Sequence, residues 1–226
     1  MSKNFSMVNL DFGHTPGGWQ VSISAMLSAL PDFGLAALFL ITWIKPDAIG
    51  ESMVSYLVVV MLLEFIIVHS SGFMGHIMIG DGDKKNRGIA LVGLGLFYTL
   101  FVGAFAVSSG EWWPLAAFWG MTLNRVLFIL LGQAPDGKEK ELLQKSWAVG
   151  AMFYVLSVTV TVIAPVPEFG ITSDVIRSLG FDSDGLWVEQ PEHALACGVL
   201  YFSAVALSEL YGHRWLKRSS VTSSSH

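Results

Sequence analysis

The sequence has little charge and almost no cysteine. Only 14% of its 226 residues are charged, whereas a soluble domain usually carries about a quarter. Hydrophobic residues make up 53% of the chain and occur in long uninterrupted blocks. A water-soluble fold of this size could not bury such blocks, so an ordinary soluble fold is excluded. Cys197 is the single cysteine, so the chain cannot form an internal disulfide.

Clustered basic residues and typical targeting signals are also missing. The net charge is −5, which argues against nucleic acid as a partner because phosphate binding needs a basic face. We expect no cleaved signal peptide, since Lys3 is an isolated charge and residues 1–20 include Asp11 and Pro16. No lysine lies in the interior of the chain's long apolar runs, which excludes a retinal Schiff base.

Long apolar runs are the main feature that is present. A membrane-spanning helix needs roughly 20 apolar residues, because the hydrocarbon core is about 30 Å thick. The segments that qualify are approximately 26–45, 52–73, 88–108, 112–132, 146–165 and 192–212. The predicted fold is therefore all-α, a polytopic membrane bundle of about six transmembrane helices.

The regions outside this 26–212 domain are predicted from their composition. Residues 1–25 form a cytoplasmic N-terminal segment, and the Ser-rich residues 213–226 form a disordered cytoplasmic tail. The first span is interrupted at Pro31, which leaves two alternatives. Either the helix begins near Val21 and kinks at Pro31, or residues 19–30 lie flat on the inner membrane surface.

Basic residues predict the orientation, because loops on the cytoplasmic side are enriched in Lys and Arg. Ten basic residues fall in the segments expected inside and two in those expected outside. The inner ten are Lys3, Lys84, Lys85, Arg87, Lys138, Lys140, Lys145, Arg214, Lys217 and Arg218, and the outer two are Lys45 and Arg177. An N-in, C-in protein of a bacterial-type cytoplasmic membrane is expected. In the outer connection, Thr172 or Ser173 could cap a short helix that ends before Gly180.

Ionisable residues inside the predicted spans are few, and such residues generally face protein or water. They are Asp32, Glu64, His69, His76, Arg125 and Glu209. Counting along each helix at about 1.5 Å per residue places Glu64 near the middle and most of the others in the cytoplasmic half. We therefore predict a polar cluster in that half, formed by Asp32, Glu64, His69, Arg125 and Glu209.

Glu64 is the strongest functional candidate in this cluster. Arg125 stays charged and needs a carboxylate partner or a path to the interface, and Glu64, Glu209 and Asp32 are its candidate partners. Because carboxylates outnumber this cation, at least one of them stays without a cation and can bind a proton, as relay carboxylates do. The alternative is structural: an Arg–Glu ion pair that fixes helix packing, and a hydrogen-bonded His69.

No catalytic motif identifies an enzyme. The chain has no Gly-x-Ser-x-Gly, His-Glu-x-x-His or helical Glu-x-x-His pattern. A metal or haem site stays open as an alternative, because enough ligand types are available. The candidate ligands are Glu64, His69, His76, Glu209 and His213.

The leading functional hypothesis is a small transporter or channel-like protein for protons, ions or a small solute. A non-catalytic accessory or assembly subunit of a membrane complex is the second, and a metal- or haem-dependent membrane enzyme or electron carrier is the third. The expected partners are the lipid bilayer and either a second copy of the chain or the subunits of a membrane complex.

Overall fold

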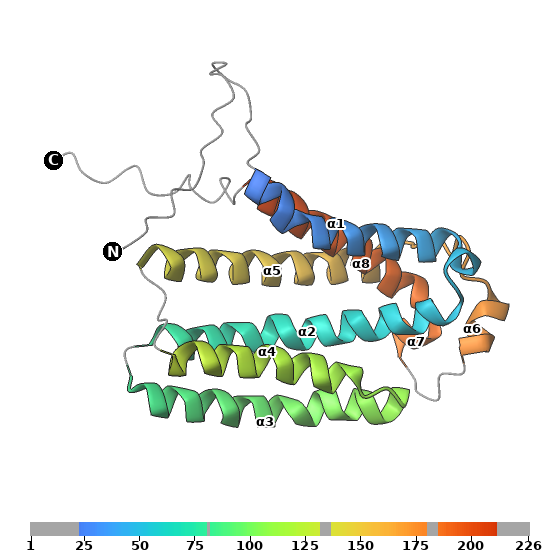
Figure 1. Cartoon of the computed structure of the whole chain (residues 1–226). Helices are drawn as coiled ribbons and strands as arrows, with labels where there is room; N and C mark the ends of the chain where they lie inside the picture. The colour runs from blue at the N-terminus through green and yellow to red at the C-terminus, as the bar shows by residue number, and fades with distance from the viewer. Residues whose placement is uncertain (1–22, 81, 132–136, 180–184, 212–226) are drawn as a thin grey trace, which may run out of the picture.

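The structure is a computed structural model that describes residues 23–80, 82–131, 137–179 and 185–211. The regular structure in these residues is entirely helical, as predicted (Figure 1). The elements are α1 (Ile23–Ile44), the short 3-10 helix η1 (Pro46–Ala48), α2 (Ser52–Ile79), α3 (Lys84–Ser109), α4 (Trp113–Leu130), α5 (Gly137–Ile163), α6 (Ser173–Leu179), α7 (Leu186–Glu189) and α8 (Pro191–Leu210).

Six of these helices are long and apolar enough to cross a membrane, namely α1 to α5 and α8. They correspond to the six predicted segments, although α2 and α5 extend several residues further at one end. In α5 the extension is polar and carries an ion pair between Glu141 and Lys145 at i,i+4 spacing, which supports a helix beyond the apolar segment. The predicted short helix before Gly180 is α6, and the Thr172 hydroxyl accepts a hydrogen bond from the Val175 amide at 3.4 Å.

The first helix is continuous through Pro31, which lies inside α1. Residues 23–30 are thus the first two turns of the same helix that continues to Ile44, rather than a separate segment. Both alternatives for the start of this helix, near Val21 or as a flat segment over residues 19–30, also involve residues 19–22, which lie outside the described residues. α3 ends at Gly110, whose φ of 71° is the left-handed conformation that glycine adopts most easily after a helix.

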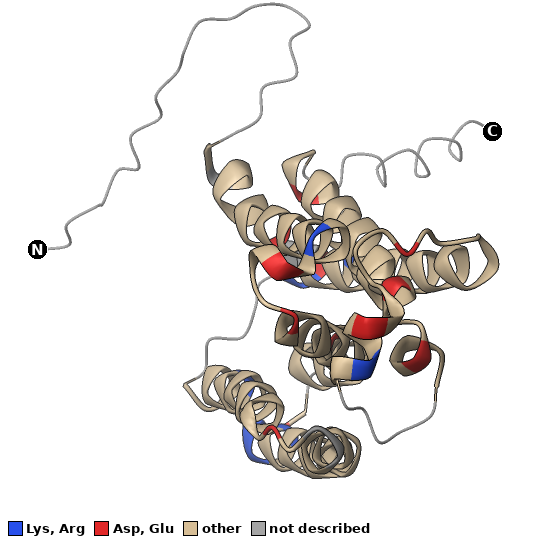
Figure 2. Cartoon of the chain, turned by 90° about the vertical axis from the view of Figure 1, so that its right-hand side faces the viewer, with Lys and Arg blue, Asp and Glu red and all other residues tan. Residues whose placement is uncertain are grey.

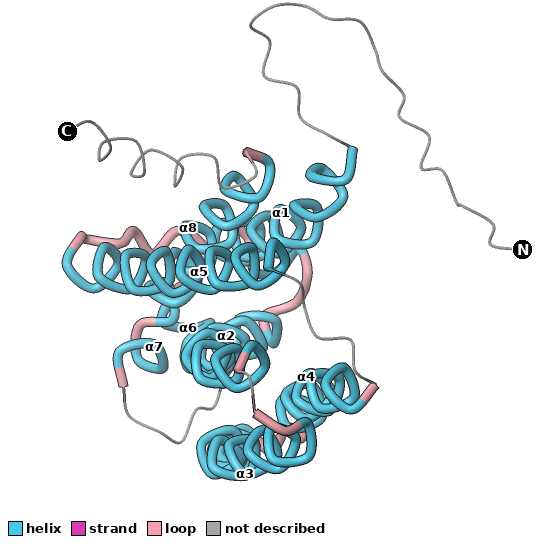
Figure 3. The backbone as a smooth tube through the Cα atoms, turned by 90° about the vertical axis from the view of Figure 1, so that its left-hand side faces the viewer, coloured by secondary structure: helices cyan, strands magenta, loops and turns pink. Residues whose placement is uncertain are grey.

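The long helices form two groups on either side of α2. α1, α5 and α8 pack together on one side, and α3 pairs with α4 on the other, so that α2 is the element that both groups share (Figures 1 and 3). α6 and α7 lie at one end of this arrangement, in the connection between α5 and α8.

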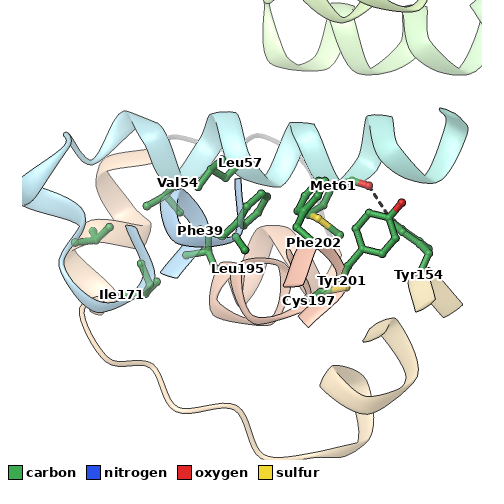
Figure 4. Close-up of a cluster of buried hydrophobic side chains, with 12 residues drawn as sticks. Phe39, Val54, Leu57, Met61, Tyr154, Ile171, Leu195, Cys197, Tyr201 and Phe202 are labelled. Atoms are coloured by element: carbon green, nitrogen blue, oxygen red, sulfur yellow. Dashed lines mark hydrogen bonds between the residues drawn. The ribbon is translucent and has the colours of Figure 1, made fainter. Parts of the chain in front are cut away.

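Each group has its own apolar core. The first core lies between α1, α2, α5, α6 and α8 and includes Phe39, Met61, Leu195 and Phe202 (Figure 4). The second lies between the other end of α2, α3 and α4 and includes Met74, Tyr98 and Phe118. Because lipid is as apolar as these side chains, close packing rather than exclusion from water must hold such helices together.

Glycines at three helix contacts allow this packing. A Cβ at Gly198 of α8 would lie 2.3 Å from the Phe39 ring of α1, and one at Gly72 of α2 would lie 2.3 Å from the Trp147 ring of α5. A Cβ at Gly95 of α3 would lie 3.0 Å from Thr122 of α4. Small residues at such positions let membrane helices approach closely. By contrast, a Cβ at Gly93 or Gly103 of α3 would meet no atom within 4 Å. These two glycines are therefore not needed for close helix packing, unlike Gly95.

The two ends of the bundle differ in charge. One end contains the α2–α3 turn and the start of α5, and its described charged side chains are the basic Lys84, Lys85, Arg87, Lys140 and Lys145 and the acidic Asp83 and Glu141. The other end contains η1, the α3–α4 turn, α6 and α7, and Figure 2 looks onto it. Its described charged residues are Asp47, Glu51, Glu111, Glu168, Asp174, Glu189 and Glu192, with the basic Lys45 and Arg177. The connections that the sequence places on one side of a membrane thus lie at one end of the structure.

Large apolar side chains also cover the outward faces of the helices. Leu100 of α3 is 71% exposed and Val155 of α5 is 64% exposed. A surface of this kind would be unstable in water but is suited to lipid. Six apolar helices with apolar outer faces indicate an integral membrane protein.

Candidate functional site

Glu64 lies near the middle of α2, and its side chain is directed toward α8. Its Oε1 accepts a hydrogen bond from the hydroxyl of Tyr201 at 2.7 Å. Tyr201 is only 4% exposed and Glu64 is partly buried, so the carboxyl group is held between α2 and α8. Such a donor stabilises the carboxyl group, because an unsatisfied polar group in an apolar environment is costly.

A second tyrosine completes this site from α5. The Tyr154 ring lies edge-on against that of Tyr201, with the ring centroids 5.4 Å apart. Its hydroxyl donates to the backbone carbonyl of Met61 at 2.9 Å, one turn before Glu64 on α2 (Figure 4). Tyr154 therefore packs against Tyr201, but its own hydroxyl donates to the Met61 carbonyl rather than to Glu64.

Two further predicted residues belong to the same region. The carboxyl group of Asp32 on α1 interacts electrostatically with Glu64 and also with Glu209 on α8. The Oε2 atom of Glu209 is buried and has no hydrogen-bond partner among the residues that the structure describes. Among the described residues none of these three carboxyl groups forms an ion pair. We refer to Asp32, Glu64 and Glu209 as the carboxyl cluster.

Arg125 is not part of the carboxyl cluster. Its guanidinium group donates to the Ser71 hydroxyl at 2.8 Å and contacts the Met74 sulfur at 2.9 Å. These partners on α2 are neutral, whereas the sequence suggested a carboxylate. The positive charge of Arg125 is therefore not neutralised by any acidic group within the described part of the chain.

His69 is also separate from the carboxyl cluster. Its Nδ1 lies 2.8 Å from the Tyr98 hydroxyl of α3, and its ring packs against Phe65 and Phe73 of its own helix. It therefore joins α2 to α3, which is the structural alternative considered for this residue. The five residues predicted to form one cluster thus occupy three places.

The candidate metal ligands do not converge. In residues 23–80, 82–131, 137–179 and 185–211, no three His, Cys, Asp or Glu side chains form a group that could hold a metal ion. Glu64 binds Tyr201, His69 binds Tyr98, and His76 lies near Arg125. His213, the remaining candidate, lies outside the described residues.

Tyr201 was not predicted from the sequence, because the candidates were limited to acidic, basic and histidine residues. A tyrosine in the middle of an apolar helix is a signal that could have been used, since a buried hydroxyl usually has a partner. Glu192 was missed as well: it is 6% exposed at the start of α8, and its buried Oε2 has no hydrogen-bond partner in the described part of the chain. This residue lies at the end opposite to Arg125, so buried acidic groups are not confined to one half.

Comparison with known proteins gives no match: no family model, no characterised protein and no solved structure is significantly similar to the chain.

The geometry of the carboxyl cluster limits its chemistry. The three carboxyl groups come from three different helices and have no cationic partner in the described residues, so each can take up or release a proton without breaking an ion pair there. The Tyr201 hydroxyl can donate to one form of Glu64 and accept from the other. This arrangement is suited to proton transfer, a role in which buried carboxyl groups are common.

Proposed function

We propose that this protein is a small membrane transporter or channel-like protein in which Glu64 carries protons. The observation that supports this most directly is the hydrogen bond between Glu64 and Tyr201 inside a bundle of apolar helices. A neutral hydroxyl can hydrogen-bond to a carboxyl group in its protonated or its ionised form, whereas a structural ion pair would hold the group in the ionised form only.

Access to Glu64 from one end of the bundle supports the same proposal. Ser71 follows Glu64 by seven residues, so both side chains lie on the same face of α2 and about 10 Å apart along its axis. Ser71 lines a cavity of about 360 Å³ at the basic end of the structure. A proton that enters by this cavity would have to travel about 10 Å along α2 to reach Glu64.

We further propose that the basic end is cytoplasmic and that both termini lie on that side, in a bacterial-type cytoplasmic membrane. The support is the charge difference between the two ends, since cytoplasmic loops are enriched in Lys and Arg.

Thiol labelling can test this orientation, because the single Cys197 is buried and can be replaced by Ser. A cysteine at the exposed Ser173 of α6 should react with a membrane-impermeant reagent in intact spheroplasts. A cysteine at the exposed Asn86 of α3 should react only after the membrane is opened. The reverse pattern would invert the proposed topology, and labelling of both in intact spheroplasts would rule it out.

The proposed activity is tested by proton flux into liposomes that contain the purified protein and a trapped pH-sensitive dye, with a potassium–valinomycin potential as the driving force. We expect a flux well above that of protein-free liposomes. Tyr201→Phe should lower this flux about tenfold, because it leaves the buried carboxyl group without its donor, a loss of about 1–3 kcal/mol.

Tyr154→Phe is the matched control for Tyr201→Phe. Both substitutions remove one buried hydroxyl and retain the aromatic ring, but the Tyr154 hydroxyl binds the Met61 carbonyl and not Glu64. Flux through Tyr154→Phe should therefore stay near that of the unmodified protein. Equal losses in both variants would show that packing, rather than the bond to Glu64, determines the flux.

A further inference from the structure

A hollow lined by both polar and apolar side chains lies around Arg125, outside the carboxyl cluster. This cavity of about 360 Å³ is formed by the last turns of α2, by Arg125 of α4 and by the start of α5. Its volume is in the range of about 300–1,000 Å³ that is typical of small-molecule sites. We refer to it as the Arg125 cavity.

The Arg125 cavity is positively charged. Of the five N–H donors of a guanidinium group, Arg125 directs one to Ser71 and one to Met74, which leaves donors for a ligand. His76 also lines the cavity, and no Asp or Glu is among its described lining residues. Beside it, Arg87 donates to the carbonyls of Ile77 and Met78 at the end of α2, which adds a second positive charge near the rim.

The rest of the lining is divided between polar and apolar groups. Gln144 and Ser146 of α5 supply an amide and a hydroxyl, whereas Ile79, Leu143 and Trp147 supply apolar surface. The Trp147 ring is held in place, because its Nε1 donates to the Val68 carbonyl at 2.9 Å and its edge packs on Gly72. A ligand that fits this lining would have an anionic group to meet Arg125 and a short apolar part to meet the apolar side chains.

We propose that the Arg125 cavity binds a phosphate ester of net negative charge, with the phosphate on the guanidinium group of Arg125 and the organic part against Trp147 and Leu143. Arginine matches phosphate oxygens in geometry as well as charge. The phosphate ester could belong to a phospholipid headgroup or to a small soluble compound, and both sources share this chemistry. Its lining residues are separate from the carboxyl cluster, so binding there does not depend on proton transport, although the cavity is the one by which protons are proposed to approach Glu64.

Isothermal titration calorimetry of the detergent-solubilised full chain tests the proposal with three probes. Dioctanoyl phosphatidylglycerol represents an anionic lipid, glycerol 3-phosphate represents a soluble ester, and dioctanoyl phosphatidylcholine is the zwitterionic control. We expect at least one of the first two to bind more tightly than the third. Preference for the lipid or for the soluble ester identifies the source, and failure of both to bind more tightly than the control overturns the proposal.

Two substitutions remove the site in different ways. Arg125→Gln removes the charge and should weaken binding at least tenfold, roughly the effect of losing a charged hydrogen bond. Gly75→Leu keeps every charge but fills the cavity, because Gly75 lines it and a Cβ there would meet no atom within 4 Å. It should weaken binding to a similar degree, and it keeps the test valid if Arg125→Gln fails to fold.

Each substitution has a matched control. Lys145→Gln removes a basic charge from the same end of the bundle, and Gly93→Leu adds the same side chain at a glycine of α3 that also faces open space. Both should change the dissociation constant less than twofold. If Lys145→Gln weakens binding as much as Arg125→Gln, the affinity reflects the general charge of this end, and the proposed site is wrong.

Discussion

Replacing Glu64 by Gln should reduce the proton flux through the protein to that of protein-free liposomes. Glutamine has nearly the same shape as glutamate, and its Oε1 can still accept the hydrogen bond that Tyr201 donates to Glu64 at 2.7 Å. The substitution therefore preserves the packing and removes only the ability to bind and release a proton. The measurement is the initial rate at which the liposome interior acidifies under a fixed membrane potential, as reported by the trapped dye.

The control for Glu64→Gln removes a negative charge elsewhere. Asp174 of α6 is exposed and pairs with Arg177 at 3.0 Å, and such surface pairs contribute little to stability. Asp174→Asn should leave the flux unchanged. If Glu64→Gln conducts protons as well as this control does, Glu64 has no role in transport.

The same variant separates the two proposals for this molecule. Glu64→Gln should bind phosphate esters as tightly as the unmodified protein, because the Arg125 cavity is lined by other residues. Loss of flux with intact binding would support both proposals. Intact flux with intact binding would contradict only the proposed role of Glu64 in proton transport.

Replacing Gly198 by Leu should destabilise the fold by about 3 kcal/mol, the upper end of the usual effect of overpacking. The first added carbon would lie 2.3 Å from the Phe39 ring. That ring cannot move aside easily, because Phe39 is completely buried and packs on Phe202 with ring centroids 5.5 Å apart. For a chain of this length the melting temperature in detergent should fall by about 10 °C.

Gly93→Leu is the matched control for Gly198→Leu. Both add a leucine inside a helix, where it is intrinsically favoured over glycine by about 0.8 kcal/mol, but a Cβ at Gly93 meets no atom within 4 Å. The melting temperature of Gly93→Leu should therefore be unchanged or slightly higher. Equal destabilisation of both variants would contradict the close packing of α1 and α8.

A double-mutant cycle can assign the effect to this contact. Phe39→Leu removes the ring that Gly198 faces, so it should reduce the cost of Gly198→Ala when the two are combined. Residues in direct contact are expected to be non-additive by about 0.5–3 kcal/mol. Additive effects on the free energy of unfolding would show that Phe39 and Gly198 act independently.

The carboxyl cluster was only partly accessible to prediction. Depth along a helix can be counted, which is why Asp32, Glu64 and Glu209 could be grouped from the sequence. The direction of Arg125 could not be predicted in this way, because a long side chain can reach several neighbours. Its contacts with Ser71 and Met74 depend on how α4 packs against α2.

The hydrogen bond to Glu64 shows the same limit. Tyr201 follows Glu64 by 137 positions, and nothing in the local pattern of either helix connects the two. Helical periodicity defines which residues share a face of one helix. It leaves open which other helix that face contacts.

The sequence by itself determined the all-helical character and the six apolar helices, because helix length and hydropathy are properties of contiguous residues. It also determined which connections are rich in basic residues. The tertiary structure decided that α2 lies between two helix groups, that the predicted cluster separates into three places, and that a cavity forms at Arg125. These features arise from contacts between helices, where the close fit of Gly198 on Phe39 and of Gly72 on Trp147 sets which side chains meet.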